Sequence, residues 1–137
     1  MTPDLPTLFE VIEATWPAAA MRMVGPFKAR DGQGGGKRVS AASLEAETLP
    51  DTDAIAQAEQ AMKAMGQPPL FMLRPGQEAF DAILAAQGYE VIDPTNIYLG
   101  PTAPLMKDPL PRAMAFDVWP PLAIQRDLWK EGGIGPD

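Results

Sequence analysis

The alternation of apolar and polar residues predicts short helices and strands separated by frequent turns. The pattern is clearest from Gln67 to Leu99, which fits the order strand, helix, strand, strand. The apolar run Leu70–Leu73 has the length of a buried strand and is too short for a buried helix. Gly88 is placed to cap the helix that follows. Residues at helical spacing in that helix are Phe80, Ile83 and Leu84, with Ala79, Ala82 and Ala86 allowing close approach of a neighbour.

After this helix the chain is expected to form two more strands. Tyr89–Ile92 and Ile97–Leu99 are rich in β-branched and aromatic residues. The residues between them, Asp93-Pro94-Thr95-Asn96, are typical of a turn. The pattern therefore predicts an extended pair at 89–99.

The N-terminal part predicts one helix. Thr7 and Glu10 have the spacing of a capping box, in which each side chain bonds an otherwise unpaired backbone N–H. The helix is expected to end near Pro17. Its apolar residues are expected to face the core: Leu8, Val11, Ile12 and Trp16. The next segment, Ala18–Val24, fits either a second short helix or a connection.

Two strands and a second long helix are expected next. Phe27–Arg30 and Lys37–Leu44 fit strands joined by the loop 31–36, and a helix from Val39 is the alternative for the second of them. The acidic turn Leu49–Asp53 suits a helix start, because carboxylates are favourable at the positive end of the helix dipole. The helix carries on one face Ile55, Ala58, Met62 and Met65, and Gly66 is placed to end it.

The pattern divides the chain into a domain at 1–100, a proline-rich linker at 101–112 and a strand–helix segment at 113–137. A half-buried strand is expected where apolar residues alternate with other types: Met114, Phe116 and Val118. A short helix is expected from Leu122 to Lys130, with Ile124 and Leu128 on one side.

Composition permits a core and excludes several kinds of chemistry. The 137 residues are 46% hydrophobic, which favours a folded chain over a disordered one. The net charge of −7 counts against nucleic acid as a partner. With no cysteine and no histidine, the chain has neither thiolate nor imidazole for a metal site, a nucleophile or a general base. No segment resembles a membrane span or a signal peptide, so we expect no membrane partner and a cytoplasmic location.

The glycine-rich segment Gly32–Arg38 is the first candidate for a binding site. Glycines let a backbone approach phosphates closely, and basic side chains beside them neutralise the charge. The residues of such a cradle would be Gln33, Gly34, Gly35, Gly36, Lys37 and Arg38. Their spacing fits neither a P-loop nor a dinucleotide fingerprint. A flexible hairpin loop with solvated ends is the alternative interpretation.

Carboxylates and tryptophans form two further groups of candidates. Four carboxylates lie close together in the sequence: Glu45, Glu47, Asp51 and Asp53. They could form a site for a cation or an amine, or they could be the solvated start of a helix. Trp16 fits the core by its place in the helical pattern, whereas Trp119 and Trp129 flank the last predicted helix and are candidates to face a partner. Three methionines are expected to fill gaps in the core: Met62, Met65 and Met72.

The order of these elements resembles a known family. From about Asp53 to Leu99 the chain is similar to the C-terminal part of the GCN5-related N-acetyltransferase (GNAT) fold, in which helices alternate with strands and the last strands pair antiparallel. The predicted helix that runs into Gly88-Tyr89 resembles the family's last helix, which typically ends in Gly followed by Phe or Tyr. The whole chain resembles the N-terminal half of bacterial acetyltransferases that carry two such units in tandem. The resemblance implies an α/β (α+β) fold with a mixed, mostly antiparallel sheet flanked by helices.

The family's acetyl-CoA site is altered in this sequence. The family motif is Gln or Arg, two residues, Gly, one residue, then Gly or Ala, and its backbone N–H groups hold the pyrophosphate at the start of a helix. Here Glu47–Asp53 occupies that place and is acidic, without glycine. Gln33–Gly36 reproduces the first part of the motif, but Arg38 occupies the final small position. Leu84 stands where the family commonly has a Tyr that protonates the departing thiolate.

The resemblance therefore implies a unit that keeps the scaffold and lacks the cofactor site. We expect a non-catalytic half of an acetyl-CoA-dependent N-acetyltransferase that is inactive alone, does not bind acetyl-CoA alone, and shapes the acceptor-amine pocket or supports the catalytic half. The expected partner is a second GNAT unit, into which Ala113–Ile134 would lead, or a second copy in a homodimer. No catalytic residue and no metal ligand are assigned. A stand-alone protein-interaction or small-ligand module on the same scaffold is the alternative.

Overall fold

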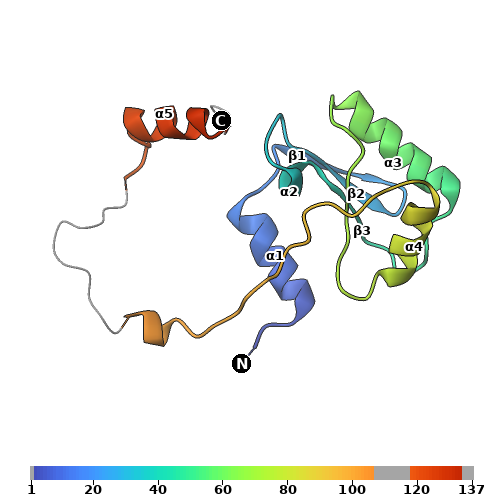
Figure 1. Ribbon diagram of the computed structural model, residues 1–137, viewed down its shortest axis with the longest axis horizontal. Helices are drawn as coiled ribbons and strands as arrows, with labels where there is room; N and C mark the ends of the chain where they lie inside the picture. The colour runs from blue at the N-terminus through green and yellow to red at the C-terminus, as the bar shows by residue number, and fades with distance from the viewer. Residues whose placement is uncertain (1, 107–117, 134–137) are drawn as a thin grey trace. The chain divides into compact units, whose positions relative to one another are not determined.

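The structure, a computed structural model, describes residues 2–106 and 118–133. The chain divides into two units, Met1–Gly88 and Tyr89–Asp137. The fold is mixed α/β, because the described residues form five α-helices, a 3₁₀ helix and a four-stranded mixed sheet. All four strands belong to the first unit (Figure 1). The predicted fold class is thus confirmed.

The sheet has the strand order β1–β2–β3–β4. β1 (Ala20–Val24) and β2 (Phe27–Asp31) form an antiparallel hairpin, and β2 also pairs antiparallel with β3 (Ala42–Leu44). β3 runs parallel to β4 (Phe71–Met72), and the crossover that a parallel pair requires is helix α3 (Thr52–Ala64). Helix α4 (Glu78–Ala86) follows β4.

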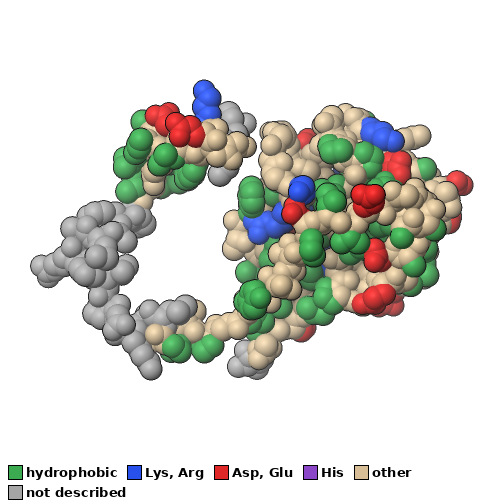
Figure 2. Space-filling model, viewed as in Figure 1, with side chains coloured by type: hydrophobic (Ala, Val, Ile, Leu, Met, Phe, Trp, Pro, Cys, Tyr) green, Lys and Arg blue, Asp and Glu red, His purple; other side chains and the backbone are tan. Residues whose placement is uncertain are grey.

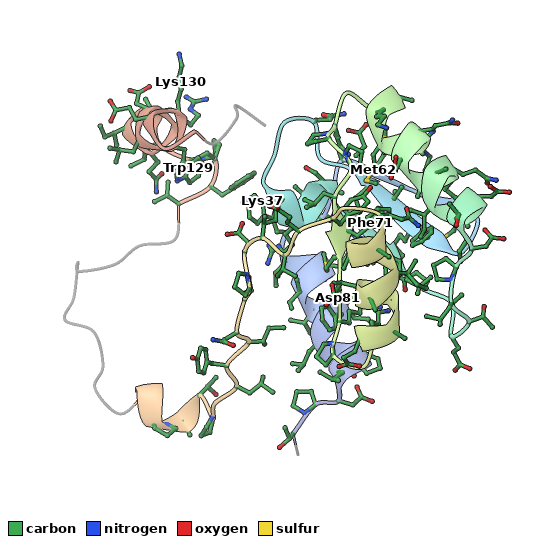
Figure 3. All side chains as sticks on the ribbon, turned by 45° about the vertical axis from the view of Figure 1, so that its right-hand side comes forward. Lys37, Met62, Phe71, Asp81, Trp129 and Lys130 are labelled. Carbon is green, nitrogen blue, oxygen red and sulfur yellow. The ribbon has the colours of Figure 1, made fainter. Side chains whose placement is uncertain are left out.

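One face of the sheet encloses the apolar core together with α3 and α4. Phe27 of β2, Phe71 of β4 and Phe80 of α4 form an aromatic cluster with ring centroids 5.3, 5.7 and 5.8 Å apart. Figure 3 shows Met62 of α3 beside Phe71. Fully buried side chains in this core also include Ala29, Ala42, Ile55 and Ala58. Apolar burial on this face is therefore the main stabilising contribution to the first unit.

The opposite face of the sheet is polar and is partly covered by α1 (Leu5–Thr15) (Figure 1). Lys28 and Arg30 point to this side because they alternate with Phe27 and Ala29 along β2. Helix α1 contributes no buried side chain. Its attachment to the sheet therefore depends on partly buried apolar contacts and on the ion pairs described below.

Helix α1 begins earlier than predicted. Its N-cap is Asp4, whose carboxylate accepts a hydrogen bond from the Thr7 backbone N–H at 3.0 Å. The capping box predicted at Thr7 is wrong, because Thr7 already lies within the first turn. The inward orientation predicted for Val11 and Trp16 is also wrong, since these side chains are 53% and 47% exposed. The helix ends before Pro17, as predicted.

The segment left open at Ala18–Val24 contains strand β1. Gly25-Pro26 forms the two-residue turn between β1 and β2, and Gly25 has the φ of +56° that a type II′ turn requires at its first central position. The predicted strand Lys37–Leu44 is correct only in its second half, which is β3. Its first half is the short helix α2 (Lys37–Ser40), which begins two residues before the alternative start at Val39.

The two predicted helices that enclose the core are confirmed. Asp51 caps α3 by accepting a hydrogen bond from the Ala54 backbone N–H at 2.8 Å. Gly66 and Gly88 follow α3 and α4 with positive φ values of +74° and +88°, the left-handed conformation that commonly ends a helix. Of the apolar positions predicted for α3, Met65 alone is only half-buried.

The pair of strands predicted at 89–99 is wrong for the described chain, because no residue of this segment is in a strand. Strands require a partner to satisfy their backbone groups, and the apolar side chains here are exposed: Val91, Ile92, Ile97, Tyr98 and Leu99. The helix predicted at 122–130 is confirmed as α5 (Ala123–Glu131). A 3₁₀ turn, η1, spans Ala103–Met106. Of the predicted strand at 114–118, Met114 and Phe116 lie outside the described residues.

Candidate functional site

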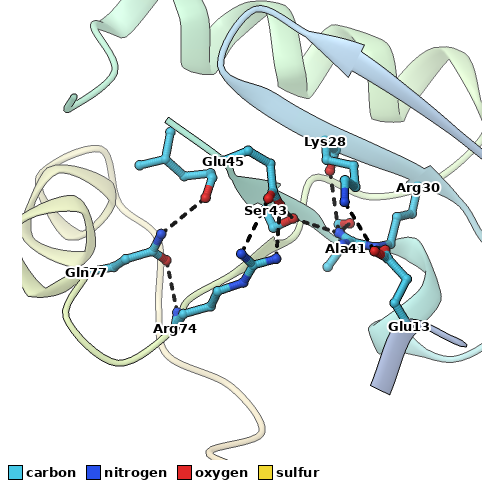
Figure 4. A network of polar contacts seen from close by, with 9 residues as sticks. Glu13, Lys28, Arg30, Ala41, Ser43, Glu45, Arg74 and Gln77 are labelled. Carbon is cyan, nitrogen blue, oxygen red and sulfur yellow. Dashed lines mark hydrogen bonds and ion pairs between the residues drawn. The ribbon is translucent and has the colours of Figure 1, made fainter. Parts of the chain in front are cut away.

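A line of ion pairs and hydrogen bonds crosses the polar face of the sheet beneath α1 (Figure 4). It begins at Glu13 of α1, which accepts hydrogen bonds from Arg30 at 2.7 Å and from Lys28 at 3.2 Å. Arg30 is 4% exposed and also donates to the Ser43 hydroxyl at 2.9 Å and to the Ala41 carbonyl at 3.1 Å. A buried cation is therefore neutralised by one carboxylate and oriented by two further acceptors.

The same line continues toward the end of β4. The Ser43 hydroxyl donates to Glu45 at 2.5 Å, and Glu45 pairs with Arg74 at 2.9 Å. The Gln77 side chain bridges the ends of the two parallel strands. Its amide nitrogen donates to the Leu44 carbonyl, and its amide oxygen accepts a hydrogen bond from the backbone N–H of Arg74 at 2.9 Å. The network thus fixes the Arg74 side chain against the sheet.

Both carboxylates of this network are held in the ionised form. Burial by itself would raise the pKa of Glu13, but the hydrogen bonds and charges of Arg30 and Lys28 outweigh it and lower the pKa below 4.5. Burial likewise opposes ionisation of Glu45. Hydrogen bonding from Ser43 and the charge of Arg74 outweigh that effect, so the pKa of Glu45 is also lowered.

A small cleft lies between α1 and this network. Two arginines at the cleft are stacked on aromatic rings of α1 and its C-cap: Arg38 lies 4.7 Å from the centre of the ring of Trp16, the C-cap residue, and Arg74 lies 4.8 Å from that of Phe9. The other lining residues are Ile12, Glu13, Ala18, Arg30, Val39 and Met72. The cleft has room for about one water molecule. Its lining thus combines apolar side chains with three arginines and one carboxylate.

Positive charge is concentrated at this cleft in a chain whose net charge is −7. Three cations line it, Arg30, Arg38 and Arg74, against the single carboxylate of Glu13. Glu45, which pairs with Arg74, and Lys28, which pairs with Glu13, belong to the adjoining network. Elsewhere acidic side chains are spread widely over the face of the first unit in Figure 2, where basic ones are sparse. The site therefore favours an anionic ligand over the cationic form of an amine.

The predicted phosphate cradle, Gln33 to Arg38, lies at the edge of this cleft. Three backbone N–H groups of the loop already bond to protein acceptors: Gly32 to Gln67 Oε1 at 2.6 Å, Gln33 to Asp31 at 3.1 Å and Gly35 to the Gly32 carbonyl at 2.7 Å. Gln67 is buried and also donates to the carbonyls of Arg30 and Ser40. The loop is thus a tightly bonded connection, and phosphate binding by Gln33, Gly34, Gly35, Gly36 and Lys37 stays a prediction.

Close packing explains two of the glycines in this loop. A Cβ at Gly32 would lie 2.3 Å from the Ser40 hydroxyl oxygen, and one at Gly35 would lie 2.8 Å from the Gly32 carbonyl oxygen. Of the six predicted residues, Arg38 is the one whose side chain the structure brings into the cleft together with Arg30 and Arg74.

The acidic group around the start of α3 does not act as one site. Glu45 pairs with Arg74, whereas Asp51 caps α3. No group of three or more side chains suited to a metal ion occurs in the part of the chain that the structure describes. None of its helices combines the length and the apolar composition needed to cross a bilayer.

Sequence reasoning missed Glu13, Arg30 and Arg74 as residues of the site. Glu13 and Arg74 are separated by six elements in the chain, and only the folded sheet brings them to one cleft. One local signal was present, because Lys28 and Arg30 alternate with the buried residues of a strand, which indicates a polar second face.

Comparison of the chain with protein-family models, with curated proteins and with solved structures finds no match.

Proposed function

We propose that this chain is a GNAT-like unit that supports an acetyl-CoA-dependent N-acetyltransferase without holding the cofactor itself. Its role is to help shape the acceptor pocket or to support a second unit that carries the thioester. The element order β3–α3–β4–α4, with β3 parallel to β4, supports this proposal together with the sequence resemblance.

The observation that carries the proposal is the start of α3. In the family, glycines before this helix expose backbone N–H groups to the cofactor's pyrophosphate. Here the carboxylate of Asp51 accepts the hydrogen bond from Ala54 and places a negative charge at that position. Asp53 adds another in the first turn. A diphosphate would therefore meet repulsion where the family offers hydrogen-bond donors.

The position of Leu84 supports the non-catalytic assignment. This residue stands where the family commonly has a tyrosine acid, and its side chain is 3% exposed in the core beneath α4. An apolar, buried side chain cannot donate a proton to a departing thiolate.

The exposed apolar residues of the second unit support a partner. In addition to the side chains at 91–99, α5 exposes Ile124 at 60% and Leu128 at 58%, and Trp119 before it is 88% exposed. Apolar surfaces of this kind typically mark interaction sites. The proposed partner is a second GNAT unit or a second copy of this chain.

The alternative, a stand-alone small-ligand module, is favoured by the cleft beneath α1. This cleft joins paired and unpaired arginines with apolar walls, and it does not depend on the altered cofactor region. The two proposals differ in whether a unit with an intact acetyl-CoA motif accompanies the chain.

Calorimetric titration of the chain with acetyl-CoA tests the first proposal. We expect no saturable heat in the micromolar range, and a GNAT enzyme with an intact motif is the positive control. Micromolar binding would place the cofactor site in this chain and refute the proposal. The coding sequence beyond Asp137 tests the tandem arrangement: an intact acetyl-CoA motif there supports it, and a stop codon favours the stand-alone module.

A further inference from the structure

Arg38 is the cation of the cleft that lacks an anionic partner. Among the described residues it makes no ion pair and no hydrogen bond, and its guanidinium is held against the Trp16 ring. Its Nε atom is buried and unbonded, and the same is true of Nε of Arg74. Buried donors normally have an acceptor, so two unsatisfied N–H groups at one cleft indicate a missing oxygen ligand.

The other charges of the cleft are already matched. Glu13 is shared by Arg30 and Lys28, and Glu45 is engaged by Arg74 through its terminal nitrogens. The carboxylates therefore leave an excess of positive charge, and Arg38 is in no ion pair of the described chain. Apolar side chains, Ile12, Val39 and Met72, line the remainder of the cleft.

We propose that the cleft between α1 and the sheet binds a small oxyanion, with a carboxylate carrying a short carbon chain as the preferred form. The oxygens take the place of the one water that the cleft admits and accept hydrogen bonds from the Nε–H groups of Arg38 and Arg74. The carbon chain contacts the apolar wall. Because such a carboxylate is larger than the one water that the cleft admits, its entry requires displacement of Trp16, which is exposed at the rim.

The guanidinium of Arg38 suits this role because its planar fork matches two oxygens of one anion, whereas Arg74, whose terminal nitrogens bond to Glu45, offers its Nε–H alone. Stacking on Trp16 and Phe9 fixes the orientation of the two groups in advance. The proposed binding of an anion is argued from the cleft alone and does not depend on the proposed function. If the proposed function also holds, the bound group is the carboxylate or phosphate of the acceptor, which would then be an anionic amine such as an amino acid.

The test compares acetate, propionate and inorganic phosphate with chloride at matched ionic strength. Binding is measured by NMR titration of the arginine Nε–H signals and of the Trp16 indole N–H, assigned with Arg38→Gln, Arg74→Gln and Trp16→Phe. We expect saturable shifts at Arg38 and Arg74, with propionate binding more tightly than acetate. Tighter binding of phosphate would keep the oxyanion site and overturn the carboxylate preference. Shifts that do not saturate, or that chloride reproduces, would overturn the proposal.

Arg38→Gln is the decisive variant, and Arg126→Gln, which removes an exposed arginine of α5, is its matched control. Loss of a charge-assisted hydrogen bond should weaken propionate binding about tenfold or more in Arg38→Gln, whereas Arg126→Gln should bind as the unmodified chain does. Arg38→Lys keeps the charge without the fork and should fall between them. Circular dichroism verifies folding of each variant. Equal affinity of Arg38→Gln and Arg126→Gln for propionate would refute the anion site. That outcome is independent of whether the chain binds acetyl-CoA, which tests the proposed function.

Discussion

The contact between Glu13 and Arg30 gives the sharpest prediction about stability. Arg30 is almost fully buried, so removal of its carboxylate partner leaves a desolvated cation. Breaking a fully buried ion pair costs about 3–5 kcal/mol. Here the Glu13 side chain is 24% exposed, and Arg30 keeps its bonds to Ser43 and Ala41. We therefore expect a coupling free energy of about 2 kcal/mol between Glu13 and Arg30.

A double-mutant cycle of Glu13→Gln and Arg30→Met measures this coupling by urea unfolding at pH 7, followed by far-ultraviolet circular dichroism. The matched control is the pair Glu59–Lys63, which lies on the surface of α3 with Lys63 59% exposed. Exposed pairs at this spacing contribute about 0.3–0.5 kcal/mol. A Glu13–Arg30 coupling no larger than that of the control pair would refute the assignment of Arg30 as a buried, partner-dependent cation.

The pH dependence has a definite sign. Folding lowers the pKa of Glu13 and of Glu45 below 4.5, so the unfolded chain binds more protons than the folded one in acid. The stability that these carboxylates contribute is fully present above pH 4.5 and is lost as the pH falls through their folded values. The Glu13–Arg30 coupling should therefore vanish in acid. A coupling that does not fall as the pH is lowered below 4.5 would contradict this reasoning.

Substitutions at three further positions test the core, a helix cap and the loop. Phe80→Ala should lower the free energy of unfolding by about 4 kcal/mol, because it removes one ring of the aromatic cluster, and a change under 1 kcal/mol in urea unfolding would contradict that packing. Asp51→Ala should cost about 1 kcal/mol and Asp51→Ser almost nothing, since serine also caps helices, and equal losses would exclude the cap as the cause. Gln67→Leu should cost about 2 kcal/mol because buried backbone groups lose their partner, and hydrogen exchange at the Gly32 amide should accelerate, whereas unchanged protection would argue against that bond.

The sequence predicted those elements whose signals are local. α3 and α4 have a capping carboxylate or an apolar stripe, and each is followed by a glycine with positive φ. Strand β2 was predicted because its buried residues alternate with polar ones. Strand β1 has no alternation of buried and exposed residues that could predict it, because most of its side chains are exposed. Its remaining signal is Gly25-Pro26, which fits a two-residue hairpin turn.

The elements that were wrongly predicted depend on distant partners or on competing caps. Segment 89–99 has strand-like composition, but composition cannot supply the neighbouring strand that completes the hydrogen bonds. At the N-terminus both Asp4 and Thr7 are good capping residues, and Pro6, which suits the first turn, favours the earlier start.

Of the charged residues that line the cleft, the sequence analysis predicted only Arg38 as a binding residue, and it did so because of the neighbouring glycines. The glycines beside it indicated a phosphate cradle, whereas two of them, Gly32 and Gly35, fit where a side chain would clash. The remaining charged residues of the cleft come from α1, β2 and the segment after β4. Strand pairing brings them together, and no spacing along the chain encodes that pairing.

The contrast between the two faces of the sheet has a consequence for how the molecule responds to acid. The aromatic side is held by apolar contacts that acid does not weaken, whereas part of the attachment of α1 is the Glu13 carboxylate, which loses its charge in acid. Lowering the pH should therefore weaken the ionic part of the attachment of α1 to the sheet, while its apolar contacts remain. Of the two sides of the sheet, the side that carries α1 is therefore the one whose stability depends on pH.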